Sequence, residues 1–261
     1  GDVYKRQLYA TVSKGYKAGG FNTQMFSDVL QQQVMKQMGF GSLYDVADVV
    51  TYKPEKSWNY EVGAHLSTPS HKVQADLALF YIDCRDQQLT VFPEGQVTGR
   101  LMTNAGRTRS FGGEASLLAT LWRNLDLQVA YGYTRATFVK FDTGKADYAG
   151  NFIPYAPQHT LYAGASYTLR TGWNWLEYVI FRVAANGAGR IYWNEANTFS
   201  QPFYALLEAS IRFEHRHWAV DVWGRNLTDT RYDTFYFMSI GNSFLQRGRP
   251  RTFGVSLSIT L

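Results

Sequence analysis

The sequence predicts an all-β protein, an antiparallel transmembrane β-barrel. Three observations lead to this fold. Apolar and polar residues alternate with a period of two over most of the 261 residues, short connections alternate with long ones, and aromatic residues gather near the ends of the alternating segments. Together these features are typical of outer-membrane barrels, in which successive residues of each strand face lipid and lumen in turn.

About ten segments carry the alternation, and each is near the length that spans an outer membrane at a tilt. In 125–133, for example, Leu125, Val129 and Tyr133 share one face, while Asp126 and Gln128 lie on the other. The predicted strands are 8–21, 58–66, 73–81, 108–121, 125–133, 161–169, 176–187, 203–213, 218–224 and a last one that ends at Leu261.

The connections between these segments predict which rim of the barrel faces which side. Short connections at 68–72, 122–126, 170–174 and 214–218 are interleaved with long ones at about 22–54, 92–104, 142–157, 193–202 and 228–248. Outer-membrane barrels have tight periplasmic turns at one rim and long extracellular loops at the other. Aromatic girdles are predicted at the two headgroup levels, formed by Tyr9, Trp58, Tyr60, Tyr131, Tyr133, Trp173, Trp175, Tyr192, Trp193 and Trp218.

Charged residues within the strands predict which face is the lumen. In 203–213, Glu208 and Arg212 share the face opposite to the apolar side chains. An arginine that faces lipid near the membrane midplane costs about 2–4 kcal/mol. We therefore expect Arg212 and Glu208 to face the lumen, and the same alternation gives Arg182 and Asp221 lumen-facing positions.

Composition excludes several other classes of protein. No apolar run approaches the roughly 18 residues of a membrane helix, because even the richest stretch, 178–185, contains Arg182. The net charge of +5 comes without a Lys/Arg tract, which argues against nucleic-acid binding. Cys84 is the single cysteine, so a disulfide within this chain and a thiolate metal cluster are excluded, and no cofactor is predicted.

Several motifs along the chain resemble TonB-dependent outer-membrane receptors in their order and spacing. They are SKGYKAGGFN (13–22), YKPEKSWNYEVGAHLS (52–67), ALFYIDCRDQQLT (78–90), NAGRTRSFGGEASL (104–117), AYGYTRA (130–136), GNFIPYAPQHTLYAGASY (150–167), GRNLTDTRYD (224–233) and GRPRTFGVSLSITL (248–261). The resemblance implies about ten C-terminal strands of a 22-stranded barrel around an N-terminal plug. It also implies uptake of a scarce nutrient, most often a ferric siderophore or another iron complex.

The resemblance further implies the partners of the protein. The TonB complex would act through a region upstream of Gly1, and lipid and lipopolysaccharide would surround the barrel. The outer-membrane assembly machinery would read the last strand through its lipid-facing residues, namely Phe253, Val255, Leu257, Ile259 and Leu261. The opening GDVYKRQ resembles translated sequencing-adapter sequence, so we expect residues 1–7 to be non-native and residues 8–261 to form the barrel domain.

Residues in the long loops are the candidates for ligand binding, since loops on a rigid scaffold carry specificity. Their rings and amides could stack on or hydrogen-bond a siderophore or sugar, although each residue has an alternative role in a girdle or in loop packing. The candidates are Tyr155, Trp193, Asn194, Asn197, Tyr236 and Phe237.

Two other functions stay open at this stage, a passive porin or structural barrel and an outer-membrane barrel protease. The sequence contains no GxSxG, HExxH, P-loop or CxxC motif, so we expect no enzyme. The acids of a protease would be Asp83 and Asp86, with His159 as the base. Residues three apart on a strand face opposite sides, however, so these two carboxylates are not expected to converge.

Overall fold

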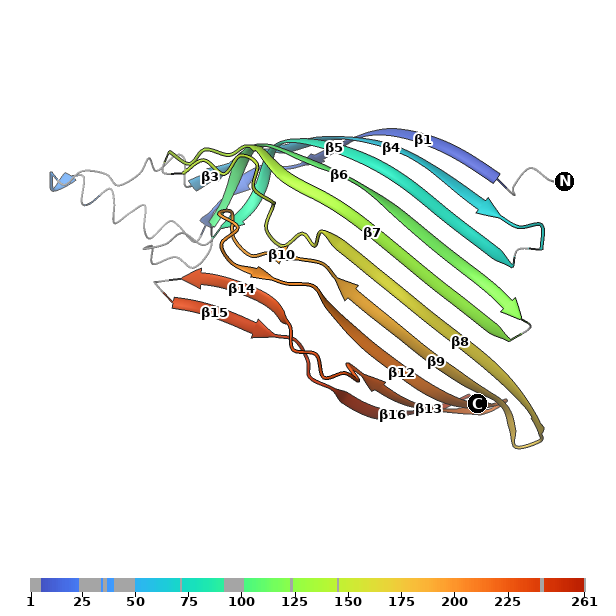
Figure 1. Cartoon of the computed structure of the whole chain (residues 1–261). Helices are drawn as coiled ribbons and strands as arrows, with labels where there is room; N and C mark the ends of the chain where they lie inside the picture. The colour runs from blue at the N-terminus through green and yellow to red at the C-terminus, as the bar shows by residue number, and fades with distance from the viewer. Residues whose placement is uncertain are drawn as a thin grey trace.

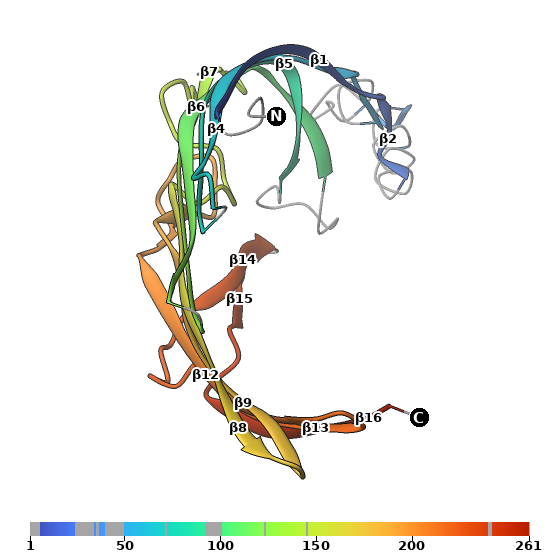
Figure 2. The ribbon, with the colours of Figure 1, turned by 90° about the vertical axis from the view of Figure 1, so that its right-hand side faces the viewer.

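A computed structural model of the chain describes residues 6–23, 34, 37–39, 50–70, 72–91, 101–122, 124–144, 146–239 and 242–260. Ten strands form one antiparallel sheet in the order β1-β4-β5-β6-β7-β8-β9-β12-β13-β16. The sheet bends into an arc that is open on one side (Figure 2). Each of these strands pairs with the sheet strand next to it along the chain, so the predicted ten-stranded antiparallel fold is confirmed.

The strands of the sheet are all tilted in the same sense (Figure 1). Their bounds are β1 (Arg6–Lys17), β4 (Glu55–Ser67), β5 (Val73–Val91), β6 (Leu101–Trp122), β7 (Leu125–Lys140), β8 (His159–Trp173), β9 (Leu176–Ala188), β12 (Tyr204–His215), β13 (Trp218–Arg225) and β16 (Thr252–Ile259). Within the described residues β1 and β16 are the two edges of the sheet, which does not close on itself.

Short two-stranded ladders form within the long connections. They pair β2 (Gly20–Phe21) with β3 (Thr51–Tyr52), β10 (Ile191–Tyr192) with β11 (Ser200–Gln201), and β14 (Asp233–Ser239) with β15 (Asn242–Arg247). The β14–β15 hairpin lies at the long-loop rim (Figure 1) and projects toward the inside of the arc (Figure 2).

The two faces of the sheet follow the predicted alternation. Along β4, exposed and half-buried residues alternate from Glu55 to Gly63. On the convex face large apolar side chains stay exposed, for example Val62 at 54% and Phe253 at 69%. Such exposure would be costly in water, whereas the lipid-facing surface of a membrane barrel is apolar.

The connections confirm the predicted difference between the rims, but four predicted loops contain strand, two of them only the short strands β3 and β11. Short turns join β6 to β7, β8 to β9 and β12 to β13, while the long connections lie at the other rim. Residues 101–104, predicted as loop, belong to β6, and the predicted loop 228–248 contains the β14–β15 hairpin. These strand segments lie beyond the level of the membrane, where neither face contacts lipid. Their sequences therefore need not alternate between apolar and polar residues.

A small apolar core stabilises the long-loop ends of β5, β6 and β7. We call it the rim core, and it consists of Leu89, Ala105, Ala136, Phe138, Phe141 and Ile153. Phe138 is only 1% exposed, and its ring lies 4.9 Å from that of Phe141. None of the helical segments that the structure describes has the length and apolar character that crossing a membrane requires.

Candidate functional site

Three long connections meet at the long-loop rim and form what we call the loop cluster, made of 141–158, 189–203 and 226–251. Tyr155 lies at its centre. Its ring stacks on Phe235 at 5.5 Å and packs against Trp193, also at 5.5 Å. The Tyr155 hydroxyl donates a 3.0 Å hydrogen bond to the carbonyl oxygen of Tyr236. One side chain therefore joins all three connections.

Two asparagine side chains hold the second connection in place. Asn197 adopts a positive φ of 57°, a conformation that asparagine tolerates better than most residues. Its amide group donates to the Phe152 carbonyl at 2.9 Å, and its oxygen accepts from the Phe152 amide at 2.7 Å. Asn194 accepts from the backbone amides of Thr198 at 3.0 Å and Phe199 at 3.3 Å.

The β14–β15 hairpin contributes a stack of rings to the loop cluster. Phe237 stacks on Phe244 at 4.9 Å, and Tyr236 stacks on Phe199 of the second connection at 4.8 Å. The hairpin also presents apolar side chains to the outside, because Phe244 and Leu245 are each 46% exposed. This end of the loop cluster therefore offers an accessible aromatic surface.

Burial shifts two titratable groups within the loop cluster. Desolvation raises the pKa of the Tyr155 hydroxyl to about 12, with a further contribution from the nearby Glu195 carboxylate. Desolvation also raises the pKa of Glu195 above its ordinary value. Glu195 therefore takes up a proton more readily here than a carboxylate in water does.

The structure brings the six sequence-predicted ligand residues together in the loop cluster, but their side chains mainly contact other residues of the cluster. Trp193 and Tyr236 are only 7% and 9% exposed. Asn194 is hydrogen-bonded within its own connection, and Asn197 is hydrogen-bonded to Phe152 of the first connection. These contacts correspond to the loop-packing alternative. The sequence analysis missed Phe235, Phe244 and Glu195, since no local pattern shows that a distant hairpin lies against Tyr155.

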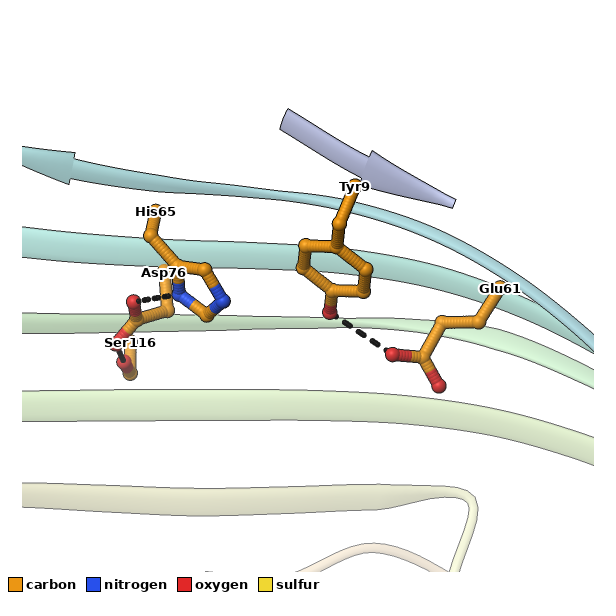
Figure 3. Close-up of polar contacts among 5 residues, drawn as sticks. All are labelled: Tyr9, Glu61, His65, Asp76 and Ser116. Carbon is orange, nitrogen blue, oxygen red and sulfur yellow. Dashed lines mark hydrogen bonds and ion pairs between the residues drawn. The ribbon is translucent and has the colours of Figure 1, made fainter. Parts of the chain in front are cut away.

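The concave face of the sheet carries a polar network from four neighbouring strands (Figure 3). The Tyr9 hydroxyl donates to Glu61 at 2.8 Å. His65 Nδ1 lies 2.6 Å from a carboxylate oxygen of Asp76, whose other oxygen accepts from the Ser116 hydroxyl at 3.0 Å. The Tyr9 ring stacks on the His65 ring at 5.2 Å.

The network shows that the girdle prediction was wrong for Tyr9, which points toward the lumen. Tyr9 lies opposite Gly63 in the β1–β4 ladder. A Cβ atom at Gly63 would lie only 2.4 Å from the Tyr9 ring, so the glycine provides the space in which this ring lies flat. The sequence did contain this signal, a glycine on the polar face of β4 between Glu61 and His65.

A second polar region on the concave face includes three of the four predicted lumen charges. Arg182, Glu208 and Asp221 line a hollow of about 450 Å³. Arg212 shares this face because it lies opposite Asp221 in the β12–β13 ladder, and it donates to Glu214 at 2.7 Å. One oxygen of Asp221 is buried and has no hydrogen-bond partner among the described residues.

The candidate residues of a barrel protease do not come together. Asp83 is held by two hydrogen bonds from Arg107, at 3.0 and 2.5 Å. His159 lies on β8, where its Nδ1 is 2.7 Å from the Tyr131 hydroxyl. Asp86 adopts a positive φ of 53° on β5. Among the described residues there is also no group of three or more side chains that could hold a metal ion.

The last strand presents its apolar side chains outward, as an assembly signal would require. Phe253, Val255, Leu257 and Ile259 are between 64% and 69% exposed. Leu261, the last predicted member of this set, lies outside the described residues.

Comparisons with known proteins agree with this geometry. The family model for the β-barrel of TonB-dependent receptor-like proteins matches residues 3–227. The pesticin receptor of Yersinia pestis is 27% identical over 259 residues, which are 97% of this chain and 33% of that protein. The chain thus spans about a third of the length of the curated relatives it matches.

Two solved structures show the same fold. The ferric yersiniabactin uptake receptor of Yersinia pestis has a TM-score of 0.75 at 23% identity, over 99% of this chain and 35% of that one. The ferric preacinetobactin receptor of Acinetobacter baumannii has a TM-score of 0.67 at 18% identity, over 98% of this chain and 34% of that one.

Proposed function

Because the chain belongs to the family of TonB-dependent outer-membrane receptors, through their β-barrel, we propose that it forms the wall and ligand-facing loops of a receptor that takes up a ferric siderophore or a similar iron complex. The observation that carries this proposal is the family match over residues 3–227. It is supported by two structural neighbours that are named as receptors for ferric siderophores.

The loop cluster supplies the chemistry for such a ligand. Siderophores often carry aromatic or heterocyclic groups, which stack on the rings of Tyr and Phe. The accessible surface around Phe244 and Leu245 lies at the outer end of the cluster, while the buried rings of Trp193 and Tyr236 fix its shape. We propose that the ligand contacts the hairpin side of the cluster and that the buried rings position it.

Transport requires energy, and the proposed partner that delivers it is the TonB complex. This partner would act on a plug that the described sheet surrounds in part, with the polar concave face toward it. We also propose that the assembly machinery reads the outward apolar row of β16, which Phe253 begins.

Growth on defined iron sources tests the proposed function. A strain without the gene is grown in iron-depleted medium supplemented with one ferric siderophore at a time, or with haem or cobalamin. The expected result is loss of growth on one ferric siderophore, with normal growth on ferrous iron and full rescue by the intact gene. Undiminished growth on every ferric siderophore would contradict the proposal.

Variants of the loop cluster test which residues contact the ligand. Phe244→Ala removes an exposed ring and should weaken binding of that siderophore by about two- to tenfold, the size of one aromatic contact of roughly 0.5–1.5 kcal/mol. The matched control is Phe181→Ala, a ring change of similar exposure on the convex face of β9 (41% against 46%), which should leave binding unchanged. Quenching of tryptophan fluorescence on titration with the siderophore measures both.

A further inference from the structure

The β14–β15 hairpin projects toward the inside of the arc (Figure 2), and the two ends of its base are fastened to each other and to β12. We call the hairpin the arm and the contacts at its base the clamp. The clamp joins residues 226–232, which precede the arm, to residues 248–251, which follow it. It is built from side chains other than the exposed rings to which the proposed function assigns the ligand.

Asn226 ties the two ends of the base together. It is only 5% exposed, and its φ of 49° lies in the left-handed region that asparagine tolerates. Its side-chain oxygen accepts from the Thr230 amide at 2.9 Å. Its amide group donates to the carbonyl oxygens of Thr230 at 3.0 Å and Arg249 at 3.1 Å. Separating the two ends would therefore leave a buried donor unsatisfied, which is costly.

Tyr232 fastens the same base to β12. Its ring stacks on the Tyr204 ring at a centroid distance of 4.5 Å and an interplanar angle of 19°. The ring also lies against Gly248, where a Cβ atom would be only 2.1 Å from it. The Gly248 amide donates to the Tyr232 carbonyl oxygen at 2.8 Å. A side chain at position 248 would therefore push the Tyr232 ring away from Tyr204.

The arm is also held along its first strand. Gln201 is 6% exposed, and its side-chain oxygen accepts from the amide of Asp233, the first residue of β14, at 2.9 Å. Farther along β14, the carbonyl oxygen of Tyr236 accepts from the Tyr155 hydroxyl at 3.0 Å, and the Tyr236 ring stacks on Phe199 at 4.8 Å. The arm is thus fixed at its base and braced by the loop cluster along β14.

The second strand of the arm is open. Every residue of β15, from Asn242 to Arg247, is exposed. The Phe244 ring stacks on Phe237 of β14 at 4.9 Å, so the position of the arm sets the position of this accessible ring. The bonds of the clamp and the brace are all made within the chain, and none of them waits for a ligand to form.

We propose that the arm is a rigid element of the lumen mouth, and that Asn226, Tyr232 and Gly248 are positioning residues that place the Phe244 ring before a ligand arrives. This inference rests on the proposed function for what meets the ring, but not for where the arm stands. A preset surface avoids the entropy cost of ordering a loop on binding. The arm therefore selects ligands that fit a surface which does not close on them.

Double electron–electron resonance on the full-length receptor measures the position of the arm without a ligand. A spin label at Leu117→Cys on β6 is combined with one at Leu245→Cys on the arm, or with one at Val222→Cys on β13 as the control pair within the sheet. These three positions are 41%, 46% and 45% exposed, and Cys84 is buried and stays unlabelled. The arm pair should give a single distance peak as narrow as that of the sheet pair. A broad or divided peak for the arm pair overturns the proposal.

Variants of the clamp test the positioning residues. Gly248→Ala and Tyr232→Ala should each broaden the peak of the arm pair and leave the sheet pair unchanged, because each breaks the stack on Tyr204. Tyr232→Phe keeps the ring and should restore the narrow peak. The matched control Tyr167→Ala removes a ring that is 43% exposed on β8 and should leave both pairs unchanged. If the arm pair stays narrow in both clamp variants, Tyr232 and Gly248 do not position the arm.

Growth on ferric siderophores separates this inference from the proposed function. A receptor that supports growth on none of them refutes the proposed function, whereas a narrow peak for the arm pair still establishes the rigid arm. When growth identifies a ferric siderophore, adding that compound should leave the distance of the arm pair unchanged, and a shifted peak overturns the proposal. Tyr232→Ala should weaken its binding by about two- to tenfold, as the loss of the Phe244 contact does, while Tyr232→Phe should not.

Discussion

The inner and outer sides of the long-loop rim differ in whether their polar and charged groups are paired within the chain. On the inner side, the polar groups of the loop cluster form hydrogen bonds with one another, and the rim core is apolar. Asn197, for example, bonds both the amide and the carbonyl of Phe152. On the outer side, Lys56 and Arg85 lie opposite each other. On the inner side the polar groups hold the shape of the connections, whereas on the outer side like charges are adjacent and Asp83 offsets them through its ion pair with Arg107.

The largest test of this comparison is Phe138→Ala in the rim core. Phe138 is 1% exposed, and removing a buried phenyl ring costs about 3–5 kcal/mol. We expect the free energy of unfolding of the receptor in detergent micelles to fall by this amount. Phe111→Ala, at a position that is 37% exposed on the convex face, is the control and should cost much less. Similar losses for the two variants would break the distinction between the sides.

Asn197→Ala tests the hydrogen bonds of the inner side. The change removes the bonds to Phe152 and places alanine at a φ of 57°. The expected loss in the free energy of unfolding is about 2 kcal/mol, followed by thermal unfolding. Asn197→Gly accepts the positive φ and should lose less. A glycine variant as unstable as the alanine variant would show that backbone conformation does not contribute.

Arg85→Gln tests the outer side, where the sign should reverse. In phosphatidylcholine alone, removing the central charge of its row should stabilise the chain by about 0.2–1 kcal/mol, because the repulsion across the ladder is lost. Thermal unfolding of the two forms measures the change, and a loss of stability in Arg85→Gln would contradict repulsion across the ladder.

Glu195→Gln tests the pH dependence of the inner side and should have the smallest effect. Burial raises the pKa of Glu195 in the folded protein. Its contribution to stability is therefore complete below the ordinary carboxyl pKa of about 4 and is lost as the pH rises through the raised value. Glu195→Gln should flatten this part of the stability profile, as measured by thermal unfolding across that pH range. An unchanged profile would exclude Glu195 as its source.

The sheet could be predicted from the sequence because its signal is local. Successive residues of a strand face lipid and lumen in turn, so each strand shows the alternation within its own residues, as 125–133 does. The structure has the ten-stranded sheet that these patterns predict. The loop cluster could be predicted only as a set of candidate residues. Tyr155 meets Phe235 and Tyr236 through contacts between residues some 80 positions apart, and no local pattern encodes them.

The row of cations on the convex face, Lys56, Arg85 and Arg107, was missed for a related reason. Each of its cations stands alone along the chain, and only the register of the three strands β4, β5 and β6 brings them into one row. Tyr9 was misplaced because its position near a strand end was read as a girdle position, although the glycine opposite it at Gly63 leaves room for an inward ring.

The order of the strands in the sheet also has a consequence for how the chain folds. Every ladder of the ten-stranded sheet joins two strands that are consecutive members of that sheet along the chain, so each closure spans a single connection, and the connections that follow β4, β6, β8 and β12 are short ones. The entropy cost of loop closure grows with loop length, and proteins dominated by such local pairings fold faster than those with distant ones. The sheet can therefore grow one strand at a time, each new edge serving as the template for the next.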